Sequence, residues 1–362
     1  MKLSDVCTKG TSNIAQKDLD ARNGAYPIYG ASGFIKNVDF YHQEKPYIAI
    51  VKDGAGVGRV MQLPAKSSVI GTMQYIIPNE GVSVEYLAYA LEHMNLAKYY
   101  LGAAIPHIYF KDYCNEPLPN HTQEEQENIS RILGTITNLI SLRKQQLSKL
   151  DELVKSRFIE MFGDPVLNPL GWKTKPLLEM GTCKNGMNFH VGDEGIEINC
   201  LGVGDFKDLA MIEKTYELPT ISLNEAPPKE YLLKNGDIVF VRSNGNKALV
   251  GRCLVVYPHD TPTTYSGFCI RYRLTTDELE TQYLLRVLKT ESIRKKMAGR
   301  GANIQNLNQQ ILASLIIPIP PKALQHQFAS FVEQIDKSKL EIQRSLKKLE
   351  TLKKALMQQY FG

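Results

Sequence analysis

The sequence predicts an α+β protein with an internal two-fold repeat, in which two globular domains are joined by two long antiparallel helices that form a coiled coil. Three observations predict this class. The chain has 362 residues, enough for two or three domains. Residues 149–163, KLDELVKSRFIEMFG, match residues 348–362, KLETLKKALMQQYFG, at a constant offset of 199. Short β-like runs with turns precede each copy, and a period near 200 residues indicates domain duplication.

The composition is that of a globular protein, with 43% apolar and 22% charged residues. No apolar run approaches the length of a membrane span, and the start, MKLSDVCTKG, lacks the apolar core of a signal peptide. We therefore expect a cytoplasmic protein with no membrane partner. The six cysteines show no CxxC pair and no zinc-like spacing with histidine, so we expect reduced thiols and no metal site.

The first domain is predicted at residues 1–120 and the second at residues 172–320. Each contains a strand, a turn rich in Gly or Asn, and a second strand. In the first domain this pattern is YIAIVKDGAGVGRVMQL at 47–63. In the second it is KNGDIVFVRSNGNKALVGRCLVV at 234–256.

Both domains place a cation just before the turn rich in Gly or Asn and an arginine just after it: Lys52 and Arg59 in the first domain, Arg242 and Arg252 in the second. Elsewhere the halves diverge, as YPIYGASGFIKNVDF at 26–40 does from GIEINCLGVGDFKDLAMI at 195–212. The repeated part therefore predicts a common frame, and the unlike part predicts a face that differs between the two domains.

Long helices are predicted at 121–162 and 321–362, with a linker at 163–171 in which Pro165 and Pro169 prevent the first helix from continuing. Apolar residues recur every three or four positions over about 40 residues, or roughly 60 Å of helix. We expect the helices to pair along a seam, meaning a line of apolar side chains between them. The alternative is that each helix packs only on its own domain. The predicted seam residues are Ile129, Ile132, Ile136, Leu150, Leu153, Phe328, Phe331, Ile335, Ile342, Leu349 and Leu352.

The formal net charge of +5 is spread along the chain, so a nucleic-acid contact would have to come from local patches. Arg and Lys suit guanine edges and phosphates, and Asn suits adenine. For each candidate the alternative is a plain surface role, and for the basic run at 286–300 it is the solvated face of a helix. The candidate DNA-contacting residues are Lys36, Asn37, Lys52, Arg59, Arg242, Ser243, Asn244, Asn246, Lys247, Arg252, Arg294, Lys295, Lys296 and Arg300.

In this order of parts the chain resembles the specificity subunit of type I restriction–modification enzymes. The resemblance covers essentially the whole chain and includes YPIYGASGF, PLPNHTQEEQENISRIL, FIEMFGDP and PIPPKALQHQFASFV. Single pieces are weakly specific, but the ordered set is strongly specific. The first domain departs from the pattern because it begins almost at Met1, without a lead like the one around Trp172.

The resemblance implies that each globular domain is a target-recognition domain for one half of a split double-stranded DNA site. It also implies that the helix pair sets the gap between the half-sites. Two modification (methyltransferase) subunits would dock on this frame, and restriction subunits would join them. S-adenosylmethionine, ATP and Mg²⁺ would be bound by those partners, with no cofactor on this chain.

Catalytic motifs are missing from the sequence. There is no GxxxxGK[ST] phosphate loop, and DGAGVGRV at 53–60 indicates a hairpin turn rather than a cofactor loop. The Asn- or Asp-Pro-Pro-aromatic tetrad of DNA amino-methyltransferases is also missing, and Asp237 lacks the other residues of a nuclease motif. We therefore predict a non-catalytic subunit. Two alternatives from other classes remain open: a self-contained DNA methyltransferase, and a coiled-coil adaptor that binds only proteins.

Overall fold

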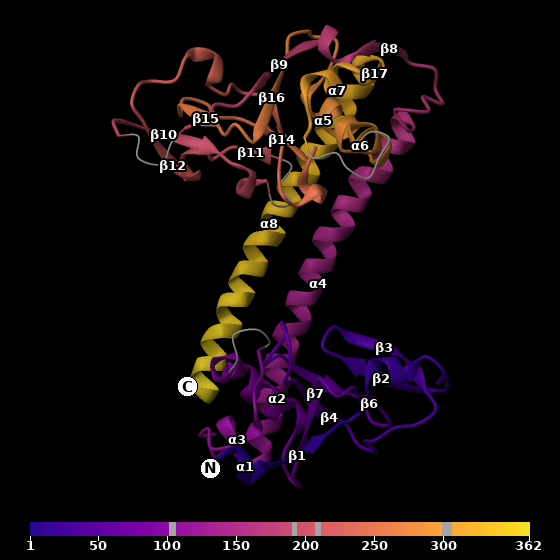
Figure 1. The fold of residues 1–362 in the computed structure, drawn as a ribbon, viewed down its shortest axis with the longest axis vertical. Coiled ribbons are helices and arrows are strands. Elements are labelled where there is room, and N and C mark those ends of the chain that lie inside the picture. The colour runs from indigo at the N-terminus through magenta and orange to yellow at the C-terminus, as the bar shows by residue number, and fades with distance from the viewer. Residues whose placement is uncertain (101–105, 190–193, 207–210, 299–305) are drawn as a thin grey trace. The chain divides into compact units, whose positions relative to one another are not determined.

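The computed structural model describes residues 1–100, 106–189, 194–206, 211–298 and 306–362 (Figure 1). The chain forms two compact units. Unit 1 comprises Met1–Gln146 and Ile342–Gly362, and unit 2 comprises Leu147–Glu341. Each unit therefore combines a globular domain with about half of each long helix. Within the described ranges, no helix is long and apolar enough to cross a membrane.

The domain of unit 1 is built on an antiparallel sheet with the strand order β1-β7-β4-β5 and a smaller sheet with the order β3-β2-β6. The strands are β1 (Cys7–Thr11), β2 (Tyr26–Gly30), β3 (Gly33–Val38), β4 (Tyr47–Val51), β5 (Val60–Leu63), β6 (Ser68–Val69) and β7 (Met73–Pro78). The short helices are α1 (Leu3–Val6), η1 (Gln16–Leu19), α2 (Val84–His93), η2 (Leu96–Tyr99) and α3 (Phe110–Tyr113).

The domain of unit 2 has a sheet of order β11-β14-β13-β16-β9, a sheet of order β12-β10-β15, and the pair β17-β8. The strands are β8 (Lys173–Pro176), β9 (Gly181–Asn185), β10 (Ile196–Leu201), β11 (Met211–Ile212), β12 (Thr220–Leu223), β13 (Asp237–Val241), β14 (Cys253–Val256), β15 (Thr263–Tyr265), β16 (Cys269–Leu274) and β17 (Ile316–Ile319). The short helices are η3 (Leu177–Glu179), η4 (Val203–Asp205), η5 (Thr215–Glu217), η6 (Lys229–Tyr231), η7 (Lys247–Leu249), α5 (Thr281–Lys289), α6 (Glu291–Ala298) and α7 (Gln309–Ala313).

The strands β4 and β13 occupy the same place in their units, and both are buried along their whole length. Because successive side chains of a strand point to opposite faces, each strand contributes to two cores. In β4, Ile48 and Ile50 join the core that contains α2, while Ala49 and Val51 join the other. β13 divides its side chains in the same way between two cores. The continuous apolar runs IAIV at 48–51 and IVFV at 238–241 therefore reflect burial on both faces.

Two helices of 40 residues, α4 (Gln123–Phe162) and α8 (Lys322–Phe361), are drawn in magenta and yellow in Figure 1. In unit 1, Leu133 near the start of α4 packs with Met357 near the end of α8. In unit 2, Phe158 near the end of α4 packs with Phe328 near the start of α8. In each unit the beginning of one helix thus lies against the end of the other, so the helices pair antiparallel. The alternative of each helix packing only on its own domain is wrong.

Two of the predicted seam residues are exposed in the structure. Leu153 and Leu352 are each 47% exposed, so their assignment to the seam was wrong. Val154, one residue further, is fully buried instead. Leu153 has the right spacing from Leu150, but Val154 is the residue that joins the apolar core of unit 2, which also contains residues of α5 and α8. Ile129, Ile136 and Phe328 are buried, and the other six are partly buried: Ile132, Leu150, Phe331, Ile335, Ile342 and Leu349.

A glutamine in the first turn of each long helix joins that helix to its domain. In unit 1, Gln126 accepts from the Ser83 N–H at 3.2 Å and donates to the His121 carbonyl at 3.1 Å. In unit 2, Gln325 accepts from the Glu280 N–H at 2.8 Å and donates to the carbonyl of Pro320 at 2.8 Å. Both glutamines are buried. The sequence repeat is therefore repeated in the hydrogen bonds that attach the helices.

The repeated Phe-Gly end has a similar structural reason. Phe162 ends α4 and packs on Tyr283 of unit 2, with ring centroids 4.8 Å apart. Phe361 ends α8 and packs on Tyr86 of unit 1 at 5.3 Å. Each long helix thus begins on the domain that precedes it in the chain and ends in the unit built around the other domain. The closing phenylalanines of the two copies therefore make equivalent contacts with a tyrosine.

Candidate nucleic-acid interface

The turn that follows β4 in unit 1 is fixed by backbone hydrogen bonds. The Gly58 N–H donates to the Val51 carbonyl at 2.8 Å, and the Ile108 N–H donates to the Lys52 carbonyl at 3.0 Å. Gly58 has a φ of +83°, and a Cβ there would lie 2.5 Å from the Ala97 nitrogen. Only glycine fits this backbone conformation at such close approach.

The turn that follows β13 in unit 2 repeats this pattern. The Gly251 N–H donates to the Val241 carbonyl at 2.9 Å, and the Leu307 N–H donates to the Arg242 carbonyl at 2.8 Å. Gly251 also has a positive φ, of +76°. The two turns predicted from sequence therefore occupy equivalent positions in the two units, and each carries a cation on either side.

Most of the second domain's candidates lie together on this turn. The Arg242 guanidinium donates to the Gly267 carbonyl at 3.2 Å, and Arg252 is partly buried. Asn244 accepts from the Asn246 N–H at 2.8 Å, and Asn246 accepts from the Ala248 N–H at 3.1 Å. These amide oxygens shape the turn, which leaves the amide NH₂ groups as the atoms suited to base edges. Ser243 lies beside them in a bridge to Asn306, and the Lys247 side chain is outside the described residues.

The candidates of the first domain are more dispersed. Arg59 is exposed and donates to the Ala31 carbonyl, at the β2–β3 turn, at 2.8 Å. Lys52 lies 3.7 Å from the Asp53 carboxylate. Lys36 is partly buried and donates to the Leu19 carbonyl at 3.0 Å, while Asn37 is exposed on β3. The structure therefore brings Arg59 close to the β2–β3 turn and attaches Lys36 to η1.

The basic run at 286–300 is not one exposed patch. Arg286 is 9% exposed, and burial lowers the pKa of its guanidinium. Arg294 is partly buried and donates to the Val250 carbonyl at 3.2 Å, so it supports the turn after β13. Lys295 pairs with Glu291 at 2.6 Å, and Lys296 is exposed. Arg300 lies outside the described residues.

Two acidic residues beside β4 and in β13 have partners far along the chain. Asp237 is buried and accepts two hydrogen bonds from Arg273, at 2.8 Å to Nε and 2.7 Å to Nη2. This contact makes Asp237 part of the fold rather than a nuclease carboxylate. Asp53 contacts the ring of His107 next to the first turn. Sequence reasoning missed this pair because 54 residues separate its members, and no local pattern joins them.

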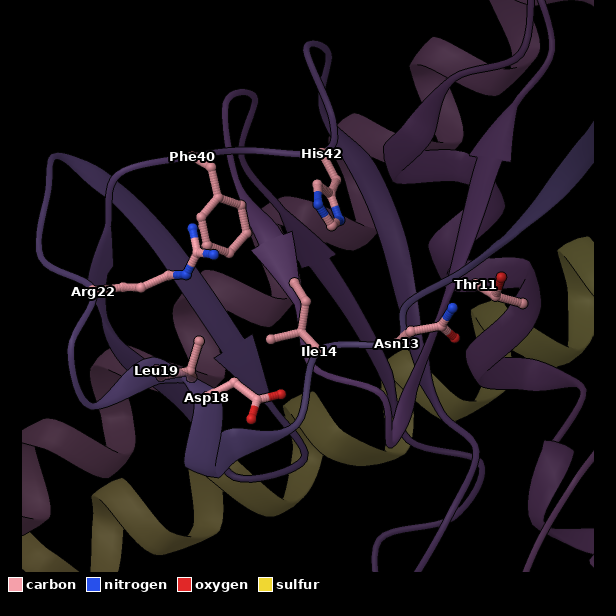
Figure 2. A pocket seen from close by; sticks show the side chains of 8 residues that line it. All are labelled: Thr11, Asn13, Ile14, Asp18, Leu19, Arg22, Phe40 and His42. Atoms are coloured by element: carbon pink, nitrogen blue, oxygen red, sulfur yellow. The ribbon is translucent and has the colours of Figure 1, made fainter.

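A hollow of about 480 Å³ opens on the first domain, and Figure 2 shows the side chains that line it. The Arg22 guanidinium lies over the Phe40 ring, 5.1 Å from its centroid, and 3.5 Å from the Asp39 carboxylate. The lining combines donors, acceptors and apolar groups: Thr11, Asn13, Ile14, Asp18, Leu19, Arg22, Phe40 and His42. Sequence analysis missed this hollow, because its residues come from separate segments before and after the first β-hairpin.

Comparisons with known proteins agree with this architecture. Residues 1–152 and 169–354 match the family model of the type I restriction modification DNA specificity domain. The type I restriction enzyme MjaVIII specificity subunit of Methanocaldococcus jannaschii is 25% identical over 90% of this chain and 81% of its own length. The StySPI specificity subunit of Salmonella potsdam is 24% identical over 86% and 72%.

A solved structure shares the fold. The crystal structure of a type I restriction–modification S subunit from M. genitalium covers all of this chain and 95% of its own, with a TM-score of 0.64 and 15% sequence identity. These findings place the chain in the class of DNA sequence-specificity proteins. Within that class, the chain belongs to the type I restriction modification DNA specificity family. The relatives are named as the specificity subunits of their enzymes.

Proposed function

We propose that this chain reads an asymmetric, bipartite DNA site, one half-site with each domain, for a type I restriction–modification complex. The observation that carries the proposal is the pair of equivalent turns after β4 and β13. Their backbone hydrogen bonds match, and each turn is flanked by cations. The domains around them differ, so the half-sites would differ as well.

The chemistry of the turns suits DNA. Cationic side chains such as Arg59 and Lys296 would neutralise phosphates, and Arg and Asn side chains would read base edges in a groove. Arg294 would act through the turn that it supports and make no phosphate contact. The internal bonds of Asn244 and Asn246 pre-form the turn, so little conformational entropy would be lost when DNA binds.

The helix pair is suited to set the gap between half-sites. Both α4 and α8 run through both units as continuous helices of 40 residues. A paired helix of that length is stiffer than a flexible linker. We propose that it limits the spacers that allow both domains to bind at once.

Catalysis would come from partner subunits. Two copies of a modification subunit would bind the repeated frame, because a two-fold repeat offers equivalent surfaces to identical partners. Restriction subunits would join that assembly. S-adenosylmethionine, ATP and Mg²⁺ would be held by these partners and not by this chain.

The test is to co-express the chain with its modification subunit and map methylated bases across a genome. We expect a split, asymmetric motif that appears only when this chain is present. Methylation by this chain alone would favour a self-contained methyltransferase. If no methylated motif appears and the chain shows no salt-sensitive DNA binding, the results would favour a protein-only adaptor.

The hollow of the first domain yields a sharper prediction. Arg22→Ala is expected to relax one position of the first half-site, with a loss of about 1–3 kcal/mol of discrimination there, as for a bidentate base contact. The second half-site should be unchanged. Binding to a panel of single-base variants of the site measures both effects. Arg131→Ala, which removes an exposed arginine from α4, is the matched control and should leave both half-sites intact. An unchanged first half-site in the Arg22→Ala chain would show that the hollow is not used.

A further inference from the structure

Several repeat-equivalent residues on the long helices are identical although they are exposed. Leu153 and Leu352 are each 47% exposed, and Lys149 and Lys348 precede them by four positions. Other identical pairs, such as Gln126 and Gln325, are buried, so packing within the chain explains them. Packing does not explain an identical exposed leucine with an identical exposed lysine.

On each long helix, the lysine and the leucine that follows it lie on one face, since positions four apart are neighbours. A further exposed identical pair, Lys155 and Lys354, is two residues beyond the leucines and faces another direction.

A shallow, open depression lies between side chains on one face of α8 around Leu352. The residues that line it are Arg344, Lys347, Lys348, Thr351, Leu352 and Ala355. The aliphatic stems of long cationic side chains cover such surface while their charges stay in water. Ala355 and its equivalent Ser156 are both small, so a partner side chain can approach either leucine closely. The depression is therefore an apolar contact point with a basic rim.

We propose that Leu352 and Leu153, each with its neighbouring lysine, are two equivalent anchors that bind two copies of one partner chain. The partner would present an apolar socket edged by acidic side chains, which complements the leucine and the lysine. Duplication within one chain indicates that the same partner surface is met twice. The inference rests on the proposed function, in which that partner is the modification subunit, and it adds the residues that hold each copy.

The test is the stoichiometry of the complex between the full chain and the modification subunit, measured by native mass spectrometry. The unaltered chain is expected to bind two copies. Leu352→Glu and Leu153→Glu should each reduce this number to one, because a carboxylate would enter the apolar socket beside acidic groups. The double variant should bind none.

Leu340→Glu is the matched control, because Leu340 is also 47% exposed on α8 but its repeat equivalent is Ser141. This variant should still bind two copies. All three leucines are exposed, so the unfolding midpoints of the variants should stay close to that of the parent.

Two copies on each single variant would overturn the inference and leave the proposed function intact. Loss of copies from the Leu340→Glu chain as well would also overturn it, since any added charge would then suffice. If the unaltered chain binds no copy, the docking part of the proposed function fails. If the double variant loses only self-association, the anchors serve a second copy of this chain and the inference is wrong.

Discussion

Replacing Phe328 by alanine is expected to lower the free energy of unfolding by about 3–5 kcal/mol, as for other fully buried phenylalanines. Phe328 is fully buried, and its ring lies 5.5 Å from that of Phe158 and 5.6 Å from that of Phe162. The substitution removes these edge-on contacts and leaves a cavity where α4 and α8 meet in unit 2. Urea unfolding followed by circular dichroism measures the effect.

Phe268→Ala is the matched control, because it makes the same chemical change in the same unit at a side chain that is 62% exposed. Its effect should be within about 0.5 kcal/mol. Equal losses from the two substitutions would contradict the assignment of Phe328 to the centre of the helix pairing.

Removing one heptad from each long helix is expected to shorten the gap in the DNA site. Residues 142–148 and 341–347 are repeat-equivalent, and deleting seven residues keeps the apolar seam in register. Each helix shortens by about 10 Å, which corresponds to roughly three base pairs at 3.4 Å each. The preferred spacer should therefore shorten by up to about three base pairs, while both half-sites stay the same. Binding to a library of split sites with varied spacers measures the change.

Deleting the segment from α4 alone is the control for this experiment. The two helices then no longer match in length, so we expect weaker DNA binding and no new preferred spacer. Altered half-sites with an unchanged gap in the double deletion would contradict the role of the helices as a spacer.

Features that repeat within the chain could be predicted from sequence. The offset of 199 located both long helices, and the shared strand–turn–strand pattern located the equivalent turns, whose backbone hydrogen bonds match in the two units. Gly58 and Gly251 are an example, since each turn needs a positive φ. The same pattern in both halves therefore predicts a structural element more strongly than the pattern in either half alone.

Features that depend on contacts between distant segments could not be predicted. Leu153 has the spacing of a seam residue, but its neighbour Val154 is the one buried in the core of unit 2. Arg286 and Arg294 read as part of a basic surface, yet one is buried and the other supports a turn. The hollow beside Arg22 is assembled from separate segments, and no spacing within either of them signals it.

Under the proposed function, each domain reads its own half-site independently of the other. The most direct test replaces residues 1–120 with a second copy of residues 172–319, the repeat-equivalent domain, and maps methylated bases with the modification subunit present. We expect a symmetric split motif in which both halves match the half-site of the second domain. The original asymmetric motif, or a motif in which the second half-site also changes, would contradict the claim.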